Sequence, residues 1–340
     1  MGWRYGQWVV EHPLPLGASS RPAVGALVRA GEPLATGTLL GSPIKVEGAR
    51  KLGVEPEDVD RVARVQVGSD VARGTVLART GRRFARVVTA PADGRLIHRS
   101  YEGDFYIAPI TGTWTVRASM DGTVRRSDDA AVTVEGSAWG LGGVAAYGPD
   151  AFGELALGVD APTDELAPGR IDVKMRDKIL VGGARIAAEA ITRAHACGAA
   201  GLVAGAAPAG GLRVVYGDEV TASGSSTVED RPTLLCLLGF GSGPLPTEVY
   251  RPFVAFAGRR AAVNVASARL FVFAPEALLD APLDAPALVL AGDFGGVRPL
   301  EGETSLTGVT RFASDAFCEG LATQDGVVPI PNVLPYDAPR

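Results

Sequence analysis

A pattern of glycines and apolar residues occurs twice in the first third of this chain. The string V-x-x-G-x-x-L-A-x-G-T-x-L begins at Val28 and returns 37 residues later at Val65, with Val71 in place of the first leucine. A second echo relates Val88–Leu96 to Val116–Val124, 28 residues on, and places Asp-Gly at 93–94 and at 121–122. Repetition on this scale indicates repeated supersecondary units made of short strands and tight turns. The repeat therefore constrains the architecture, whereas no constellation of residues specifies a reaction.

Composition and charge narrow the class of protein. With 340 residues and 46% hydrophobic content, the chain is too long for one ordinary core and predicts a multi-domain globular protein. Its 44 glycines and 24 prolines favour turns and short strands over long helices. The net charge of -5 has the wrong sign for a dedicated nucleic-acid binder, which disfavours nucleic acid as a partner.

Cysteine usage and the N-terminal sequence bear on the compartment. The three cysteines, Cys197, Cys236 and Cys318, lie far apart in sequence, so neither a zinc cage nor a disulfide framework is predicted. The first residues lack the charged and apolar regions of a signal peptide, and no apolar run reaches the roughly 18 residues of a membrane span. We expect a cytoplasmic protein without membrane insertion.

The first part of the chain has the features of a β domain. From about residue 24 to residue 134, short apolar or alternating runs are separated by glycine-containing turns. One helical segment is predicted at Pro56–Val62, where acidic residues stand at a potential helix start. We expect this β domain to occupy residues 1–165.

The pattern changes near residue 168 to that of an α/β domain. A buried strand at Lys178–Val181, an alanine-rich helix at Ile186–Cys197 and a strand at Gly201–Ala204 predict a β-α-β unit. A further strand at Thr233–Leu238 and a helix at Thr247–Ala257 extend the α/β domain to residues 166–275. Beyond a linker rich in proline and alanine, residues 287–335 predict a small β tail. The expected fold class is multi-domain and β-rich plus α/β.

Two segments resemble known families. The segments Gly68-Ser69-Asp70-Val71, Gly74-Thr75-Val76-Leu77 and Ala90-Pro91-Ala92-Asp93-Gly94 resemble the biotinyl/lipoyl-like hammerhead, or barrel-sandwich hybrid, domain. That resemblance implies two interlocked β layers, one from each copy of the repeat. The tail is faintly similar to SH3-like modules through Gly295-Gly296 and its closing Asp325-Gly326 turn.

The hammerhead resemblance departs from its family at one position. The turn that presents a modified lysine in that family falls around Gly81-Arg82-Arg83-Phe84, and no lysine stands there. An arginine guanidinium stays protonated and is not the amine nucleophile that is acylated. We therefore expect no cofactor, and we expect a framework that holds or docks other parts, as in the unmodified hammerhead domains.

Glycine-rich turns at the ends of two predicted strands form the candidate ligand site. Gly182 and Gly183 follow the first strand of the α/β domain, and Gly239, Gly241, Ser242 and Gly243 follow a later one. Backbone N–H groups in such turns can cradle a phosphate, and strand ends of one sheet can share a crevice. A plain turn is the competing interpretation, because the spacing is not G-x-G-x-x-G and Pro244 lacks an N–H.

For several other polar residues, a structural role competes with a functional one. The arginines Arg79, Arg82, Arg83 and Arg86 belong to the densest charge run and form either a solvated β face or a docking surface for an acidic partner. Asp93 and Asp121 hold equivalent repeat positions, where Asp-Gly indicates hairpin turns rather than acid–base chemistry. The histidines His12, His98 and His195 have no partnering carboxylate in sequence, and no metal site or catalytic triad is predicted.

These observations favour a scaffold or assembly subunit without catalytic activity that associates with itself or with another protein subunit. One alternative is a nucleotide- or phosphate-binding protein, or an enzyme, that uses the glycine-rich crevice of the α/β domain. A second alternative is an adaptor of nucleic-acid machinery, suggested by the tail and the arginine run.

Overall fold

The chain folds into two compact units. The computed structural model describes residues 2–15, 17–81, 85–216 and 231–279, together with strand segments between 283 and 329. Unit 1 comprises residues 1–15, 20–35 and 116–340, and unit 2 comprises residues 16–19 and 36–115. Within the described part, no helix has the length and apolar character needed to cross a bilayer.

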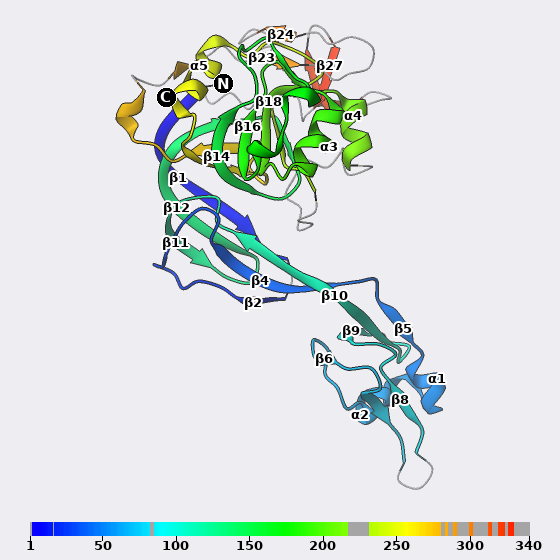
Figure 1. Cartoon of the computed structure of the whole chain (residues 1–340). Coiled ribbons are helices and arrows are strands. Elements are labelled where there is room, and N and C mark those ends of the chain that lie inside the picture. The colour runs from blue at the N-terminus through cyan, green and yellow to red at the C-terminus, as the bar shows by residue number, and fades with distance from the viewer. Residues whose placement is uncertain are drawn as a thin grey trace. The chain divides into compact units, whose positions relative to one another are not determined.

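A parallel sheet forms the centre of unit 1 (Figure 1). Its four strands run side by side in chain order: β14 (Ala151–Leu157), β16 (Lys178–Val181), β18 (Gly201–Ala207) and β19 (Leu234–Phe240). All seven residues of β18 are buried, as expected for a parallel strand that is covered on both faces. The strands predicted at 178–181, 201–204 and 233–238 are thus present and adjacent.

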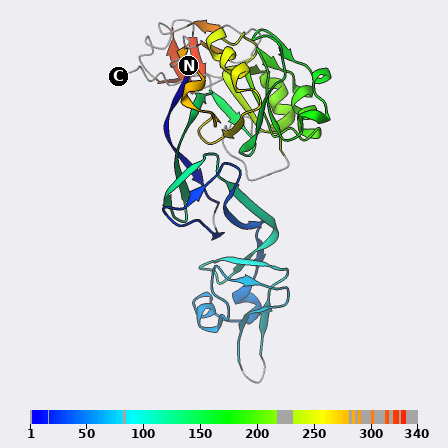
Figure 2. The same cartoon turned by 60° about the vertical axis from the view of Figure 1, so that its left-hand side comes forward.

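Three helices connect and cover these strands. They are α3 (Ala188–Ala196), α4 (Ala209–Tyr216) and α5 (Thr247–Phe256). Helices α3 and α4, green in both views, lie next to each other, and α3 also contacts β18 (Figure 1; Figure 2). Helix α5 contacts β14 and β1 (Gly2–Pro13), which brings the N-terminal strand to the α/β core.

Antiparallel strands extend the parallel sheet at the side of β14. β20 (Arg260–Asn264) pairs with β14 and with β21 (Arg269–Val272), and β21 pairs with the long β12 (Ala131–Gly142). β12 in turn pairs with β1 from Arg4 opposite Gly140 to Pro13 opposite Ala131. The predicted boundary between 1–165 and 166–275 therefore differs from the observed division, because β1, β12 and β14 all belong to the sheet of the α/β part.

The remaining elements of unit 1 are short. They are β3 (Leu27–Val28), β11 (Gly122–Ser127), β13 (Ala145–Tyr147), β15 (Glu165–Leu166), η2 (Pro168–Arg170), η3 (Val173–Met175), β17 (Arg185–Ile186), η5 (Glu276–Leu278), β22 (Leu283–Asp284), β23 (Leu288–Leu290), β24 (Pro299–Glu301), β25 (Phe312–Ser314), β26 (Glu319–Thr323) and β27 (Gly326–Pro329). The last three form an antiparallel sheet of their own, so the tail contains β structure as predicted.

Unit 2 is a small β-rich body around its own apolar core. It contains β5 (Ile44–Val46), α1 (Gly48–Leu52), η1 (Pro56–Asp58), α2 (Val59–Val62), β6 (Asp70–Val71), β7 (Val76–Arg79), β8 (Val87–Thr89) and β9 (Gly94–Arg99). Three strands, β2 (Ala18–Ser20), β4 (Pro33–Leu40) and β10 (Phe105–Arg117), continue across the division between the units. The helical segment predicted at 56–62 is present as η1 and α2. Leu77, Leu96, Phe105 and Ile107 are fully buried in the core of unit 2.

The sequence repeat corresponds to one structural motif that occurs once in each unit. In unit 1, Gly25 donates its N–H to Val124 and Gly31 donates to Ala118, both at 2.8 Å. In unit 2, the N–H of Gly68 donates to Leu96 at 2.6 Å, and that of Gly74 donates to Ala90 at 2.8 Å. All four glycines have positive φ, between 87° and 95°, which favours glycine at these positions. The two motifs are therefore equivalent turn by turn.

The register of this structural repeat differs from the predicted one. The glycine pair 25 and 31 matches the pair 68 and 74, a separation of 43 residues, whereas the sequence pattern aligned Gly31 with Gly68 at 37. Both glycines of each pair occupy turns, so a shift by one turn also matches in sequence. The 28-residue echo agrees with the structure, since it relates Ala90 to Ala118, and these two residues accept the equivalent N–H groups of Gly74 and Gly31.

In chain order, one copy of the repeat lies between the two halves of the other, and the two copies belong to different units. The halves of the outer copy, near residues 25–34 and 116–126, lie in unit 1, and the inner copy, near residues 68–77 and 88–98, lies in unit 2. Each copy closes its own hydrogen bonds within its unit. The expectation that the copies supply alternate layers of one β body is thus wrong.

Candidate functional site

The glycine turns predicted as a ligand site meet at the carboxyl ends of the parallel strands. A Cβ atom on Gly205 of β18 would lie 3.2 Å from the carbonyl of Gly183 and 3.1 Å from that of Gly243. The structure thus brings the turn after β16 and the turn after β19 to opposite sides of β18. Ser242, between Gly241 and Gly243, is exposed.

The backbone of the same turns is bound to neighbouring backbone. The N–H of Gly182 donates to Val203 at 2.7 Å, and the N–H of Gly241 donates to Ala207 at 2.9 Å. A Cβ on Gly183 would lie 2.5 Å from the carbonyl of Asp164, because the segment after β14 packs directly on this turn. These glycines therefore permit close backbone packing, and the N–H groups of Gly182 and Gly241 already have acceptors.

The arginines of the predicted docking surface have different surroundings. Arg79 is exposed on β7, at the start of the turn, and Arg82 and Arg83 lie outside the described residues. Arg86 donates to the carbonyl of Leu52 at 3.4 Å, at the end of α1, so part of its hydrogen-bonding capacity is used within unit 2. Further along the run, Arg95 binds Asp70 at 2.7 Å and Arg99 binds Asp60 at 2.6 Å.

The repeat aspartates perform the same structural role in both copies. Asp93 accepts the N–H of Arg73 at 2.7 Å, and Asp121 accepts the N–H of Ala30 at 2.8 Å. Asp121 also receives both terminal nitrogens of Arg260 at 3.0 Å, which links the outer copy to β20. The structure differs from the predicted hairpin turns, because among the described strands β8 does not pair with β9, β10 does not pair with β11, and each carboxylate binds the backbone of a distant segment.

Removing these carboxylates is expected to destabilise the protein to different extents. Asp121→Ala should lower the free energy of unfolding by roughly 2 kcal/mol and Asp93→Ala by roughly 1 kcal/mol, because only Asp121 adds an ion pair to the backbone contact. Urea titration of both variants measures the difference. Asp129→Ala is the control, since this aspartate is highly exposed and belongs to no repeat turn. Equal losses for Asp93 and Asp121 would contradict the stronger role of Asp121.

A buried polar network joins four distant segments of unit 1. His12 Nε2 accepts the N–H of Ser119 at 2.8 Å, while Nδ1 lies 3.2 Å from the carbonyl of Val132, to which it donates as the protonated ring nitrogen. Asn264 donates its side-chain NH₂ to Ser119 Oγ at 2.9 Å and to Asp150 at 3.1 Å. Sequence analysis missed this network, because each of these contacts of His12 and Asn264 joins residues more than 100 positions apart in the chain.

Burial moves the pKa values of this network in opposite directions. It lowers the pKa of His12 to about 4, while the contact with Val132 acts in the other direction. It raises the pKa of Asp150 to about 6, against hydrogen bonds from Val265, Asn264 and Ser119. His12, Ser119 and Asn264 are at most 1% exposed, so no substrate can reach them in this structure. The network is therefore a structural connection and not a catalytic triad, whose aspartate would bind the histidine.

The other histidines and cysteines form no joint site in the described part. His98 packs on Tyr106 in unit 2, and His195 lies on α3 with Cys197 just beyond the helix end. Cys236 is fully buried in β19, which raises the pKa of its thiol to about 12 and keeps it protonated. No group of three His, Cys, Asp or Glu side chains suited to a metal occurs among the described residues.

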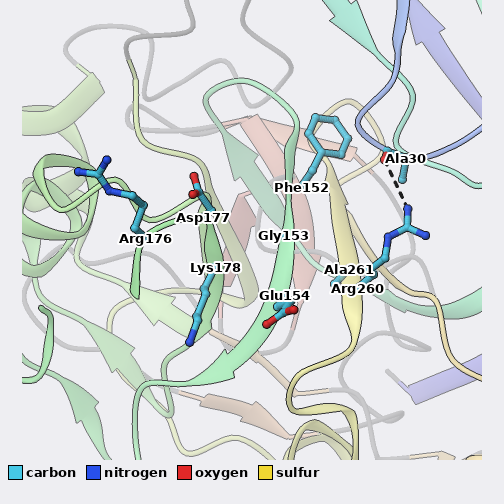
Figure 3. A pocket seen from close by; sticks show the side chains of 9 residues that line it. All are labelled: Ala30, Phe152, Gly153, Glu154, Arg176, Asp177, Lys178, Arg260 and Ala261. Carbon is cyan, nitrogen blue, oxygen red and sulfur yellow. Dashed lines mark hydrogen bonds between the residues drawn. The ribbon is translucent and has the colours of Figure 1, made fainter. Parts of the chain in front are cut away.

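A pocket of about 310 Å³ opens at the other end of the parallel strands (Figure 3). It is lined by the amino-terminal parts of β14, β16 and β20, the turn before β16 and the outer repeat turn, with the residues Ala30, Phe152, Gly153, Glu154, Arg176, Asp177, Lys178, Arg260 and Ala261. Its volume lies at the lower end of the range for small-molecule sites, roughly 300–1,000 Å³. Sequence reasoning had placed the candidate crevice at the opposite ends of these strands.

No family model, no curated protein and no solved structure matches this chain. The interpretation of the site therefore depends on its own geometry and charge.

Proposed function

We propose that this protein is a non-catalytic scaffold or assembly subunit that associates with itself. The observation that carries the proposal is the division of charge between the two units. Unit 2 has 12 lysines and arginines against 9 aspartates and glutamates, a net charge of +3. Unit 1 has 21 against 29, a net charge of -8. The two units of one chain thus carry net charges of opposite sign.

Opposite charges on one chain favour a heterologous contact, in which unit 2 of one copy meets unit 1 of the next. In unit 2, most acids are already neutralised within the unit, for example Asp70 by Arg95 and Asp60 by Arg99. Arg64 and Arg79 are exposed, and neither forms an ion pair within the described part. Their charge therefore remains available to an acidic partner surface.

A non-catalytic role is also supported by the polar groups that form hydrogen bonds within the chain. The turn aspartates, the His12 network and the N–H groups of Gly182 and Gly241 all bind other parts of the same molecule. The tail contributes an SH3-like module to this proposed framework.

Self-association is expected to depend on salt and on the arginines of unit 2. Sedimentation velocity at about 0.05 M salt should show dimers or larger species, which dissociate at about 0.5 M as screening shortens the Debye length. The double change Arg64→Glu and Arg79→Glu should weaken association by about tenfold or more, because it places acids opposite an acidic surface. Arg251→Glu on α5 is the control, since it adds acid to the acidic unit and should not weaken association.

A strict monomer at high protein concentration and low salt would contradict the proposal. The competing function, a nucleotide or phosphate ligand at Gly182 and Gly241, makes a different prediction in a thermal-shift assay. A nucleotide at 100 times its Kd would stabilise the fold by about 2.7 kcal/mol, whereas the scaffold should show no shift.

A further inference from the structure

We propose that the pocket between β14, β16 and β20 binds a small zwitterion of the amino-acid class. The proposal does not depend on self-association, because a single copy of the chain supplies every lining residue. Three observations support it: the row of charged side chains across the strands, the backbone conformation at Asp177, and the apolar ring of Phe152.

Three charged residues occupy one row across the sheet. Glu154 on β14 is opposite Lys178 on the parallel strand β16, and it is also opposite Arg260 on the antiparallel strand β20. A carboxylate therefore lies between two cations. Figure 3 shows the side chains of Lys178 and Glu154 pointing to the same side of the strands. Within the described residues, neither Glu154 nor Lys178 forms an ion pair, although they are neighbours in the sheet.

Arg260 is held in place by other contacts. Its guanidinium binds Asp121 through two nitrogens at 3.0 Å and lies 5.3 Å from the centre of the Phe273 ring. Lys178 is thus the cation of the row that is free to bind a carboxylate, and Arg260 supplies positive potential beside it.

A second carboxylate is positioned by an unusual backbone conformation. Asp177 has a φ of 59°, which is sparsely populated for residues other than glycine. Its N–H donates to Gly198 at 2.9 Å, and its carbonyl packs so close to β14 that a Cβ on Gly153 would lie 2.2 Å from it. The surrounding backbone therefore determines this conformation, which places the exposed Asp177 side chain at the pocket.

The ligand class follows from this mixture of charges. A pure anion would be repelled by Glu154 and Asp177, and a pure cation would be repelled by the lining cations Arg176, Lys178 and Arg260. A molecule with one ammonium and one carboxylate satisfies both, with its carboxylate on Lys178 and its ammonium on the acids. Phe152 provides an apolar surface for a side chain, as its ring packs beside Gly31 of the outer repeat turn.

Isothermal titration with L-leucine and two analogues tests the proposal on the unmodified protein. N-acetyl-leucine lacks the cation and leucinamide lacks the anion, so each should bind about tenfold or more weakly than leucine. Saturable leucine binding with this order supports the zwitterion site. Absence of saturable binding, or equal binding of all three compounds, would overturn it.

Two variants locate the binding. Lys178→Met and Glu154→Gln should each weaken leucine binding by about tenfold, whereas Lys178→Met should strengthen the weak binding of leucinamide, because it removes a cation that repels the ligand ammonium. Lys174→Met and Glu189→Gln are matched controls on exposed positions of η3 and α3, outside the pocket lining. Unchanged leucine binding in both pocket variants would place the site elsewhere and reject the proposal. The analogue series on the unmodified protein gives a result even if a variant fails to fold.

Discussion

Replacing Trp3 with alanine is expected to lower the free energy of unfolding by about 4 kcal/mol, the range for large aromatic truncations in a core. Trp3 is fully buried, and its ring contacts Phe253 and Phe256 of α5 edge-on at 5.1 and 4.9 Å. Its indole N–H donates to the carbonyl of Val249 at 3.0 Å. The variant loses apolar contacts and a hydrogen bond at once, and it leaves a cavity between β1 and α5. Denaturant unfolding followed by circular dichroism measures the loss.

Val9→Ala is the control for this prediction, since Val9 lies on the same strand and is 67% exposed. Its effect should stay within about 0.5 kcal/mol, as for most surface changes. A loss below about 1 kcal/mol for Trp3→Ala would show that β1 does not hold α5 in solution.

The second large effect is a pair of opposite pH dependences in the buried network. His12 has a pKa of about 4 in the folded state, below its unfolded value, so the unfolded chain takes up its proton first. Stability is therefore lost as the pH falls from about 6.5 to about 4, by up to about 3 kcal/mol. Asp150 has a folded pKa of about 6, above its unfolded value. Its contribution is fully present below about pH 4 and is lost as the pH rises through 6, by up to about 3 kcal/mol.

These two effects offset each other in the unmodified protein, and single variants separate them. Asp150→Asn removes the carboxylate titration, so its stability should fall between pH 7 and pH 4 by about 3 kcal/mol more than that of the unmodified protein. His12→Asn removes the imidazole titration, so its stability relative to the unmodified protein should rise over the same interval by a similar amount.

Urea titrations at several pH values measure the slopes, which are independent of any constant loss that a variant introduces. His98→Gln is the control, because His98 is exposed and lies in unit 2. Parallel pH profiles of the unmodified protein and both network variants would contradict the prediction, because they would show that folding does not change the pKa of His12 or of Asp150.

Local features of the fold could be predicted from the sequence. The buried strand at Lys178–Val181 and the alanine-rich helix that follows it were predicted, because a short apolar run and a helix stop at Gly198 are encoded by neighbouring residues. The equivalent repeat positions of Asp93 and Asp121 were also predicted, but their contacts were not, since the two carboxylates accept N–H groups 20 and 91 residues away.

Features that depend on distant contacts could not be predicted. The repeat register was wrong by one turn, because equivalent glycines in successive turns match equally well in sequence and only the acceptors Val124 and Leu96 distinguish them. The partners of His12 were missed, because Ser119 is 107 residues away and Val132, which the pairing of β1 with β12 places opposite His12, is 120 residues away.

The sequence by itself determined the β-rich composition, the β-α-β order and the glycine turns, because each of these follows from periodicity or backbone preference over a few residues. Only the tertiary structure decided that the two repeat copies belong to different units and that the N–H groups of Gly182 and Gly241 donate hydrogen bonds to a neighbouring strand. It also decided the row formed by Lys178, Glu154 and Arg260, since strand register places these side chains next to one another across long stretches of chain.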